Sequence, residues 1–432
     1  MKKAFITILL LLPAVNIFAQ HSFKSVEEVW NYALKNNPQD TVYSLNIASA
    51  EKSSRTAHSY IFPKVSAGFS YQKNITIPET PVPGELFGKP GQTSYLQFGQ
   101  KYNYSAGITV SKSLFDWYAR FQYKITELNV SLRKAEKEYF EQTLKEQIAQ
   151  VYYASLTSIE AVRIGHADLS VADTMLAIAG SRFSEGVIDS IVYNQAVINR
   201  NNNFEKLEKS KQYRTECLNS LKQLLGLNPV DAISLTENIS IDIKINDSEK
   251  LLPNYRHTDL LRLKNDITGI EVKKARARFY PKIDIVHYYG SLQYQDEFKL
   301  KSSDWKPNQY TCISISIPIF TGFSNKAQYD AAVIEKEIAE KNYQDELRKS
   351  DISDDNLTAA YTSSKRIVDN SKESFRISKL NVQLAEQKYS QGIFALDDYL
   401  KVFDDYLKIE NQFLNNVTEY LVNKATIEAR SK

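Results

Sequence analysis

The chain contains a short stretch in which apolar and small polar residues alternate strictly, although most of its length is charged and helical in character. In residues 312–323 (CISISIPIFTGF), Ile313, Ile315 and Ile317 alternate with cysteine and serine. In an extended strand the isoleucines therefore lie on one face and the small polar residues on the other. That pattern predicts either a sheet with one buried face or a membrane barrel with lipid outside and water inside.

Three further segments predict strands, at residues 65–71, 102–110 and 283–291. The first two alternate cleanly, whereas in the third Val286 and His287 fall on the wrong sides. The polar faces carry small hydroxyl residues, and the lengths approach the roughly nine to eleven residues that a tilted membrane strand needs. Because about eight strands are the minimum for a barrel, several copies of the chain would have to share one barrel.

Long helices are predicted in the two parts of the chain that lack proline, which breaks helices. No proline occurs between Pro90 and Pro229 or after Pro318. Apolar residues in these parts recur in steps of three and four, as in a coiled-coil seam. The seam positions are Phe121, Ile125, Leu128, Leu132, Ala135 and Tyr139, and then Tyr399, Val402, Tyr406, Ile409 and Phe413. Each part also contains a glycine, Gly186 or Gly392, where we expect a turn with positive φ between two helices.

Three short motifs occur twice in the same order, which indicates that the chain consists of two copies of one structural repeat. They are FPKV at 62–65 and YPKI at 280–283, SKSLFDW at 111–117 and SIPIFTG at 316–322, and RFSEGVIDS at 182–190 and KYSQGIFAL at 388–396. We expect a signal peptide at 1–19 and a connector at 229–262. The first repeat, at 20–228, contains a strand pair at 64–114 and a helical hairpin at 116–225. The second repeat, at 263–432, contains a strand pair at 282–319 and a helical hairpin at 321–430. Residues 74–101 are rich in proline and glycine and predict an irregular loop, with 293–309 as its shorter counterpart.

The first residues, MKKAFITILLLLPAVNIFAQ, have the three parts of a secretory signal. Lys2 and Lys3 supply the positive start, an apolar run follows, and Ala19 is a suitable cleavage point. The apolar run is shorter than the ~20 residues that a spanning helix needs. Because no later apolar run is long enough either, we expect the mature chain to be soluble in an exported compartment or to span a membrane as a barrel. Cys217 and Cys312 lie in different contexts, and we expect both to be free.

Composition excludes several classes of function. Among 432 residues the net charge is +3, and lysine and glutamate are interspersed, so a nucleic-acid partner is not indicated. The 27 tyrosines favour a membrane interface, where one end of the ring is apolar and the other wet. The five histidines have no partner at i+3 or i+4, and neither GxSxG nor GxGxxG occurs. We therefore expect no metal, no cofactor and no enzymatic activity.

In the order of its segments the chain resembles the TolC-type outer-membrane channels, the outer component of tripartite efflux and type I secretion systems. The shared order is helix, FPKV or YPKI, strand, loop, strand, SxPxF-like junction, long helix, aromatic-x-x-Gly tip and returning helix, and it occurs twice. The resemblance implies a mainly α fold with transmembrane β-strands, in which a homotrimer forms a 12-stranded β-barrel, four strands per chain, continued by a periplasmic coiled-coil α-barrel. It also implies an outer-membrane location, passive exit of substrates, and contacts with outer-membrane lipid, a periplasmic membrane-fusion adaptor and, through the adaptor, an inner-membrane transporter.

The resemblance also assigns roles to particular residues. The two helical tips would meet the adaptor through Arg182, Phe183, Gly186, Asp189, Lys388, Tyr389 and Gly392, and Ile313, Ile315 and Ile317 would face lipid. An acidic ring at the pore aperture would be formed by Asp398 with Asp397 beside it, but Lys401 stands where a second acidic position is expected. The alternative for the two aspartates is helix capping and interaction with the helix dipole, and the two roles can coexist.

Two other functions fit the same sequence. A soluble periplasmic coiled-coil adaptor or scaffold with a small sheet would explain the export signal and the heptads, but not why both strand pairs lie between long helices. A type I protein-secretion exit duct would use the same channel for a different cargo.

Overall fold

The computed structural model describes residues 20–88, 90–237 and 255–431. The predicted signal peptide at 1–19 and part of the predicted connector at 229–262 therefore lie outside the described residues. The chain forms two compact units, each of which takes segments from both halves of the sequence. Unit 1 contains Met1–Ser44, Ala135–Asp259 and Asp345–Lys432, and unit 2 contains Leu45–Lys134 and Leu260–Gln344.

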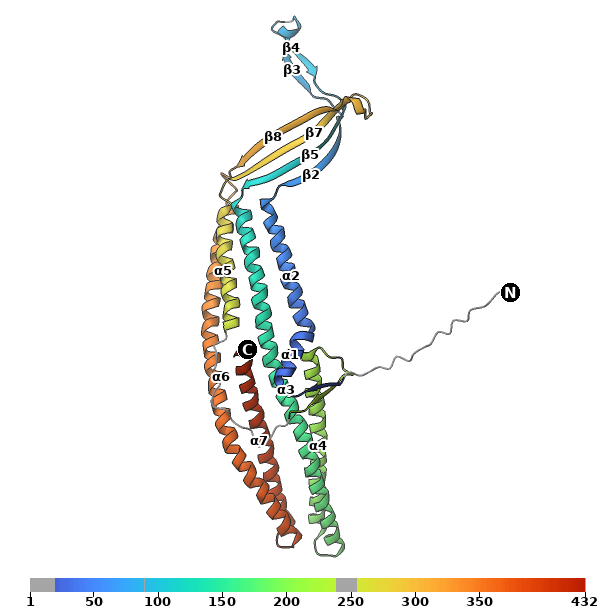
Figure 1. The fold of residues 1–432 in the computed structure, drawn as a ribbon, viewed down its shortest axis with the longest axis vertical. Helices are drawn as coiled ribbons and strands as arrows, with labels where there is room; N and C mark the ends of the chain where they lie inside the picture. The colour runs from blue at the N-terminus through green and yellow to red at the C-terminus, as the bar shows by residue number, and fades with distance from the viewer. Residues whose placement is uncertain (1–19, 89, 238–254, 432) are drawn as a thin grey trace, which may run out of the picture. The chain divides into compact units, whose positions relative to one another are not determined.

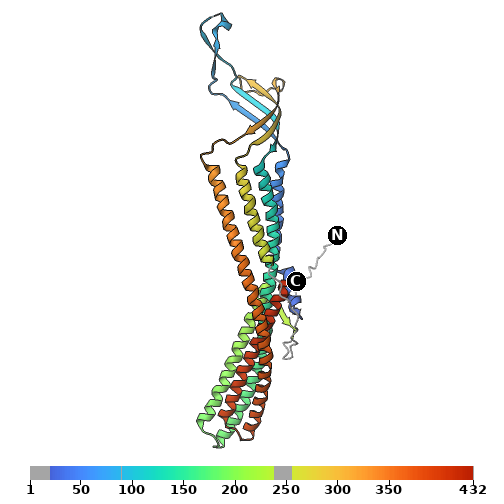
Figure 2. The same ribbon diagram turned by 90° about the vertical axis from the view of Figure 1, so that its left-hand side faces the viewer.

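Long helices form in both proline-free parts of the chain, as predicted (Figures 1 and 2). They are α3 (Trp117–Ser184), α4 (Ser190–Leu225), α6 (Ser324–Ser390) and α7 (Leu396–Ser431). Seam residues such as Ile125 in α3 and Phe413 in α7 are buried. The spacing of three and four therefore marks faces of these helices that pack inside the protein.

One core of unit 1 gathers around α1 (Val26–Asn36). Ser25 caps this helix by accepting a hydrogen bond from the backbone N–H of Glu28. Trp30 packs among buried residues of α3 and α4, and its indole N–H donates to the carbonyl oxygen of Lys145 at 2.8 Å. The large apolar ring is thus buried with its polar atom satisfied.

A parallel pair of short strands, β1 (Gln20–Phe23) and β6 (Ala232–Leu235), also belongs to unit 1 and was not predicted. Strands of four residues show too little alternation to be recognised in a sequence. Phe23 is part of the core around α1, and Leu235 packs against that core. Two further helices are α2 (Pro38–His58), between α1 and α3 in the chain, and α5 (Tyr255–Ala277), which follows β6.

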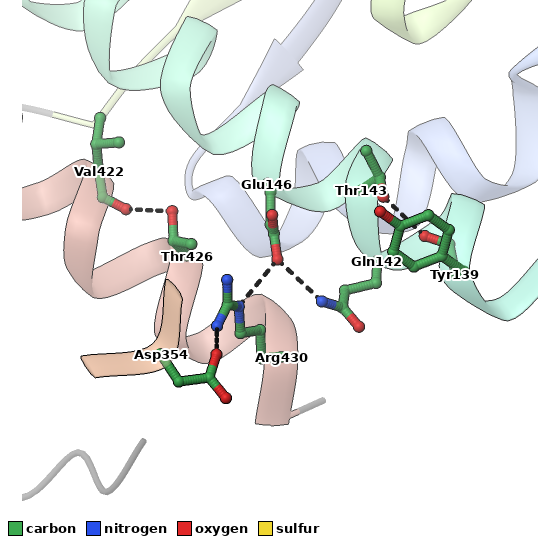
Figure 3. A network of polar contacts seen from close by, with 8 residues as sticks. All are labelled: Tyr139, Gln142, Thr143, Glu146, Asp354, Val422, Thr426 and Arg430. Atoms are coloured by element: carbon green, nitrogen blue, oxygen red, sulfur yellow. Dashed lines mark hydrogen bonds and ion pairs between the residues drawn. The ribbon is translucent and has the colours of Figure 1, made fainter. Parts of the chain in front are cut away.

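A charged junction ties the end of α7 to α3 and α6 within unit 1 (Figure 3). Arg430 donates from Nε to Oε1 of Glu146 at 3.2 Å and from Nη1 to Oδ1 of Asp354 at 2.5 Å. Gln142 donates to the same oxygen of Glu146 at 3.0 Å. Because the Arg430 side chain is 8% exposed, this is a largely buried ion pair, in which the guanidinium depends on its two partners for solvation.

Unit 2 contains a four-stranded antiparallel sheet in the order β2–β5–β7–β8. Its strands are β2 (Lys64–Lys73), β5 (Tyr102–Phe115), β7 (Lys282–Gln295) and β8 (Lys306–Ser316). All four predicted strands are present. In β8, however, the strand ends at Ser316, so Ile317 follows the strand instead of belonging to it.

The register separates an apolar face from a small-residue face. The apolar face carries Val65, Ala67, Phe69, Ile108, Tyr289, Ile313 and Ile315, and the small-residue face carries Ser66, Gly68, Ser105, Gly107, Gly290, Cys312 and Ser314. As the alternation along β7 indicated, the apolar Val286 lies on the small-residue face and the polar His287 on the apolar face. His287 is accommodated on the apolar face because its Nδ1 hydrogen-bonds with Oγ1 of Thr311 at 2.9 Å.

A row of glycines crosses the small-residue face. Gly68 pairs with Gly107, and Gly107 pairs with Gly290. The ring of Tyr288 occupies the space beside the row, since a Cβ added to Gly107 or Gly290 would lie 2.5 Å from its hydroxyl oxygen. A larger residue at Gly107 would require Tyr288 to move, and one at Gly290 would also lie 2.5 Å from the backbone carbonyl oxygen of Ala106.

The predicted irregular loop at 74–101 is wrong in part, because it contains a second small sheet. Strands β3 (Glu79–Pro83) and β4 (Thr93–Gln97) pair antiparallel, and a short 3-10 helix, η2 (Gly84–Phe87), lies between them. Prolines are compatible with β3 because, in the described part of the chain, it pairs on one side only. The shorter counterpart contains one 3-10 turn, η3 (Ser302–Asp304), and another, η1 (Ser59–Ile61), precedes β2.

Candidate functional site

The first helical tip is the turn between α3 and α4 at Gly186. This glycine has the predicted positive φ, at +73°. Its N–H donates to the carbonyl oxygen of Phe183 at 3.0 Å, and the N–H of Val187 donates to that of Arg182 at 2.8 Å. These two hydrogen bonds form the Schellman motif, which ends a helix at a residue of positive φ.

Asp189 begins α4 and acts as its N-cap. Its Oδ1 accepts hydrogen bonds from the N–H groups of Ile191 and Val192 at 2.9 and 3.0 Å. An N-cap of this kind stabilises a helix by about 0.5–2 kcal/mol relative to alanine. The local conformation of the tip alone therefore accounts for an aspartate at this position.

The second tip, between α6 and α7, repeats this geometry at Gly392. Its φ is +74°, its N–H donates to the carbonyl oxygen of Tyr389 at 3.0 Å, and the N–H of Ile393 donates to that of Lys388 at 2.8 Å. The ammonium of Lys388 lies 4.9 Å from the centre of the Phe394 ring, in the range of a cation–π contact. Both tips are thus fixed by the same backbone hydrogen bonds.

The two tips contact each other within the chain through Arg182. Its guanidinium lies 4.6 Å from the centre of the Tyr389 ring, and Nη2 donates to the carbonyl oxygen of Tyr389 at 3.0 Å. Tyr389 is 1% exposed and stacks on Tyr399 with ring centres 5.8 Å apart. Tyr389 is therefore inaccessible to a partner, and its contribution is to hold the tips together.

Exposed apolar side chains surround the tip glycines. Phe183 is 43% exposed, and Val187, Ile191 and Ile393 are 66%, 75% and 67% exposed. Of these, the sequence argument singled out Phe183 alone. A signal for two of the others was present, because a β-branched aliphatic residue directly follows the glycine in both motifs. Exposed apolar groups of this kind mark surfaces that bind other molecules.

The residues predicted to line a pore aperture lie at the start of α7. Asp397 and Asp398 are in its first turn, and Lys401 follows one turn later. All three side chains are exposed. Their position matches the helix-dipole alternative for the two aspartates and leaves their carboxylates accessible to ions.

The apolar face of the sheet in unit 2 is also open. Val65 is 67% exposed, Phe69 60%, and Ile313 and Ile315 62% each. Within the described ranges, β2 and β8 each lack a strand partner on their outer side. The sheet therefore has an exposed apolar face and two free strand edges. An apolar face of this kind marks a contact surface for other molecules or a membrane, and free edges tend to pair with a further strand.

The described residues contain no group of three or more histidine, cysteine, aspartate or glutamate side chains that could hold a metal ion. Cys217 and Cys312 are both free, as predicted. In the part of the chain that the structure covers, no helix combines the length and the apolar character that crossing a membrane requires.

A family model described as "Outer membrane efflux protein" matches the chain over residues 29–227 and 263–429. Solved outer-membrane channels share the fold. The CmeC channel of Campylobacter jejuni has a TM-score of 0.79 at 18% identity, covering 94% of this chain and 85% of that one. The open-state MtrE channel of Neisseria gonorrhoeae has a TM-score of 0.75 at 17% identity, with coverages of 94% and 88%. VceC of Vibrio cholerae has a TM-score of 0.72 at 16% identity, with coverages of 94% and 93%.

Proposed function

Because the chain belongs to the outer membrane efflux protein family, we propose that it is the outer-membrane channel of a tripartite efflux system, through which substrates leave the cell passively. The family places the chain in the outer membrane and in efflux. This location is incompatible with a soluble periplasmic adaptor or scaffold. The role of the family in efflux also agrees with the expectation that the chain is not an enzyme. The type I secretion duct would use the same channel, and the assembly argued below applies to either cargo.

The observation that carries the proposal is the pair of free strand edges on a sheet with an exposed apolar face. Strands β2 and β8 have 10 and 11 residues, and edges of that length readily pair with another chain. In the antiparallel order of the sheet, β8 of one copy runs opposite to β2 of the next, so the ladder can continue between copies. Closing the ladder with three copies gives the 12-stranded barrel.

In such a barrel the two faces of the sheet meet different surroundings. The apolar face, with Ile313 and Ile315, would contact outer-membrane lipid, and Ile317 would extend the same contact just beyond the strand. The small-residue face, with Ser66 and Ser314, would line the water-filled interior. The helical part would form the tunnel in the periplasm.

We further propose that the two tips are the docking surface for a periplasmic adaptor, which connects the channel to an inner-membrane transporter. The exposed residues Phe183, Val187 and Ile393 supply an apolar contact surface, and Gly186 and Gly392 set its shape. Arg182 and Tyr389 hold the two tips in register. Apolar side chains surrounded by polar residues are typical of binding surfaces of this kind.

The same end of α7 would form the pore aperture. Three copies of Asp398 and Asp397 would place six carboxylates around one opening, where they would attract cations and repel anions. Replacing both by alanine should reduce cation selectivity in planar bilayers. Unchanged reversal potentials in asymmetric salt would remove these residues from the pore.

The proposed assembly can be tested by disulfide trapping between neighbouring copies. Cys312 lies on the small-residue face of β8, so a partner cysteine in β2 of the next copy must lie on that face too. Single cysteines at Ser66, Gly68 or Ser70 should give covalent ladders up to three chains after mild oxidation, whereas cysteines at Ala67 should not. Such pairing is possible because paired strands bring Cα atoms to about 4.5–5.5 Å.

Each cysteine is also introduced into a Cys312→Ser background, where the ladders should disappear. The native mass of protein extracted from outer membranes in mild detergent should correspond to three chains. Recovery of a monomer from the periplasmic fraction, or cross-linking without alternation along β2, would overturn the proposed channel.

A further inference from the structure

A cavity of about 220 Å³ lies in unit 1 between α3, α6 and α7, and neither the tips nor the charged junction uses it. Its lining combines aromatic rings with carboxylates, among them Phe375, Tyr406, Glu410 and Phe413. Most grooves between packed helices are filled by apolar side chains. A cavity that contains a buried carboxylate therefore calls for an explanation.

Glu410 is the central residue of this cavity. It is 4% exposed, and its Oε1 accepts a hydrogen bond from the hydroxyl of Tyr406 at 2.6 Å. Its Oε2 is buried and has no hydrogen-bond partner among the described residues. Leaving a buried polar atom unpaired is costly, and more so for a charged group. The free oxygen is thus a ready acceptor for a donor that enters the cavity.

The lining carries three acidic side chains, Glu160, Asp168 and Glu410, and two basic ones, Arg163 and Lys379, so its acidic groups outnumber its basic groups. Arg163 is paired with Glu160, with Nε 2.9 Å from Oε2, so its charge is already engaged. Asp168 also lines the cavity, and burial together with the charge of Glu410 raises the pKa of Asp168 to about 7. Burial also raises the pKa of Glu410, although Tyr406 and the charges of Lys379 and Arg163 act in the opposite direction. The charge of Glu410 thus disfavours the ionisation of Asp168, and a cation bound in the cavity would relieve this.

Aromatic rings form the apolar wall. Phe375 and Phe413 stack with ring centres 5.1 Å apart, and Phe375 and Tyr406 stack at 6.1 Å. Phe375 and Phe413 are 5% and 3% exposed, so both rings are shielded from bulk water. Aromatic faces attract ammonium groups more strongly where water is excluded.

We propose that this cavity binds a small organic ammonium ion, whose N–H donates to Oε2 of Glu410 and whose apolar part lies against Phe375 and Phe413. Benzylammonium is a suitable probe, because it joins one ammonium to one ring and is small enough for the cavity. The site lies within a single chain. Failure of this proposal would therefore leave the channel proposal intact, and the reverse also holds.

The test is isothermal titration calorimetry of the purified full-length protein in detergent, with the titration into micelles alone subtracted. Benzylammonium should bind saturably at one site per chain, and neutral benzyl alcohol should bind at least tenfold more weakly. Glu410→Gln should weaken benzylammonium binding at least tenfold, since the amide keeps an acceptor for Tyr406 but loses the charge. Glu373→Gln, at an exposed position of α6, is the matched control and should bind as the wild type does.

Equal affinity for the amine and the alcohol, or a folded Glu410→Gln variant with wild-type affinity, would overturn the proposal. If Glu410→Gln does not fold, Phe375→Leu tests the proposed site instead, because this variant keeps the carboxylate of Glu410 and removes one aromatic ring of the wall. It should weaken benzylammonium binding at least threefold, and unchanged binding would overturn the site.

Discussion

Replacing Arg430 with methionine tests how far the charged junction of α3, α6 and α7 stabilises unit 1. The substitution keeps an apolar stem but removes the guanidinium that Glu146 and Asp354 both contact. Removing one partner of a buried ion pair costs about 3–5 kcal/mol, whereas an exposed pair contributes about 0.2–1 kcal/mol. The side chains of Arg430, Asp354 and Glu146 are 8%, 14% and 26% exposed. Because water partly solvates Glu146, we expect a loss of about 2–4 kcal/mol.

The assay is thermal unfolding of the purified full-length protein, followed by far-ultraviolet circular dichroism in one detergent at one scan rate. At about 2–4 °C per kcal/mol, the midpoint of Arg430→Met should fall by roughly 4–16 °C. The matched control is Arg376→Met in α6. Arg376 pairs with Glu373 at 2.7 Å, but its side chain is 67% exposed, so its loss should change stability by less than about 0.5 kcal/mol.

A double variant, Arg430→Met with Asp354→Asn, measures the coupling free energy between these two residues. The effects of Arg430→Met and Asp354→Asn should fall short of additivity by at least about 1 kcal/mol, as is usual for residues in direct contact. Equal midpoints for Arg430→Met and Arg376→Met would refute the reasoning, because burial would then add nothing to the ion pair.

Three other substitutions test other parts of the structure. Gly392→Val should strain the second tip by about 1–3 kcal/mol, because a β-branched residue is forced to positive φ, and should weaken adaptor binding in a pull-down while the trimer stays intact. Ile315→Arg should cost about 2–4 kcal/mol if its strand crosses the bilayer, and should reduce the amount of protein recovered from outer membranes. Asp168→Asn should reduce a pH dependence. Because the folded-state pKa of Asp168 is raised from 3.8 to about 7, the wild type binds more protons when folded and loses stability as pH rises through that window. The melting midpoint of the variant should therefore fall less than that of the wild type between pH 5 and pH 8.

Two of these substitutions have a matched control. Gln391→Val, directly before the tip glycine but at a position without positive φ, should leave adaptor binding unchanged. Ser314→Arg, on the opposite face of β8, should assemble better than Ile315→Arg. A wild-type midpoint that does not fall between pH 5 and pH 8 would contradict the argument for Asp168, and normal efflux with Gly392→Val would contradict the role of the tip.

The long helices and the strands of the main sheet were predictable because their signals are local. The absence of proline between Pro90 and Pro229 marked where a continuous helix could run, and the alternation around Ile313 marked a strand with two different faces. Gly186 and Gly392 were predictable for the same reason, since a tight turn between helices requires a positive φ that glycine adopts without strain.

The contacts between distant parts of the chain were not predictable. Arg182 and Tyr389 are 207 positions apart, and no sequence pattern indicates that the guanidinium of one covers the ring of the other. The burial of Glu410 was hidden as well, because a glutamate on a long charged helix is normally solvated. The parallel pairing of β1 with β6 was missed because strands of four residues carry too little pattern.

The glycine row in the sheet has a mechanical consequence. Where Gly68, Gly107 and Gly290 lie side by side, no Cβ atoms keep neighbouring strands apart on that face, so the sheet can curl about this line at little energetic cost. The ring of Tyr288 lies beside Gly107 and Gly290, whereas the space beside Gly68 is open. Figure 1 shows the four strands bowed along their length. In the proposed trimer, the inner face of the closed barrel leaves less room for side chains than the outer face does. The sheet therefore bends most easily along the glycine row, where the side chains of the inner face are smallest.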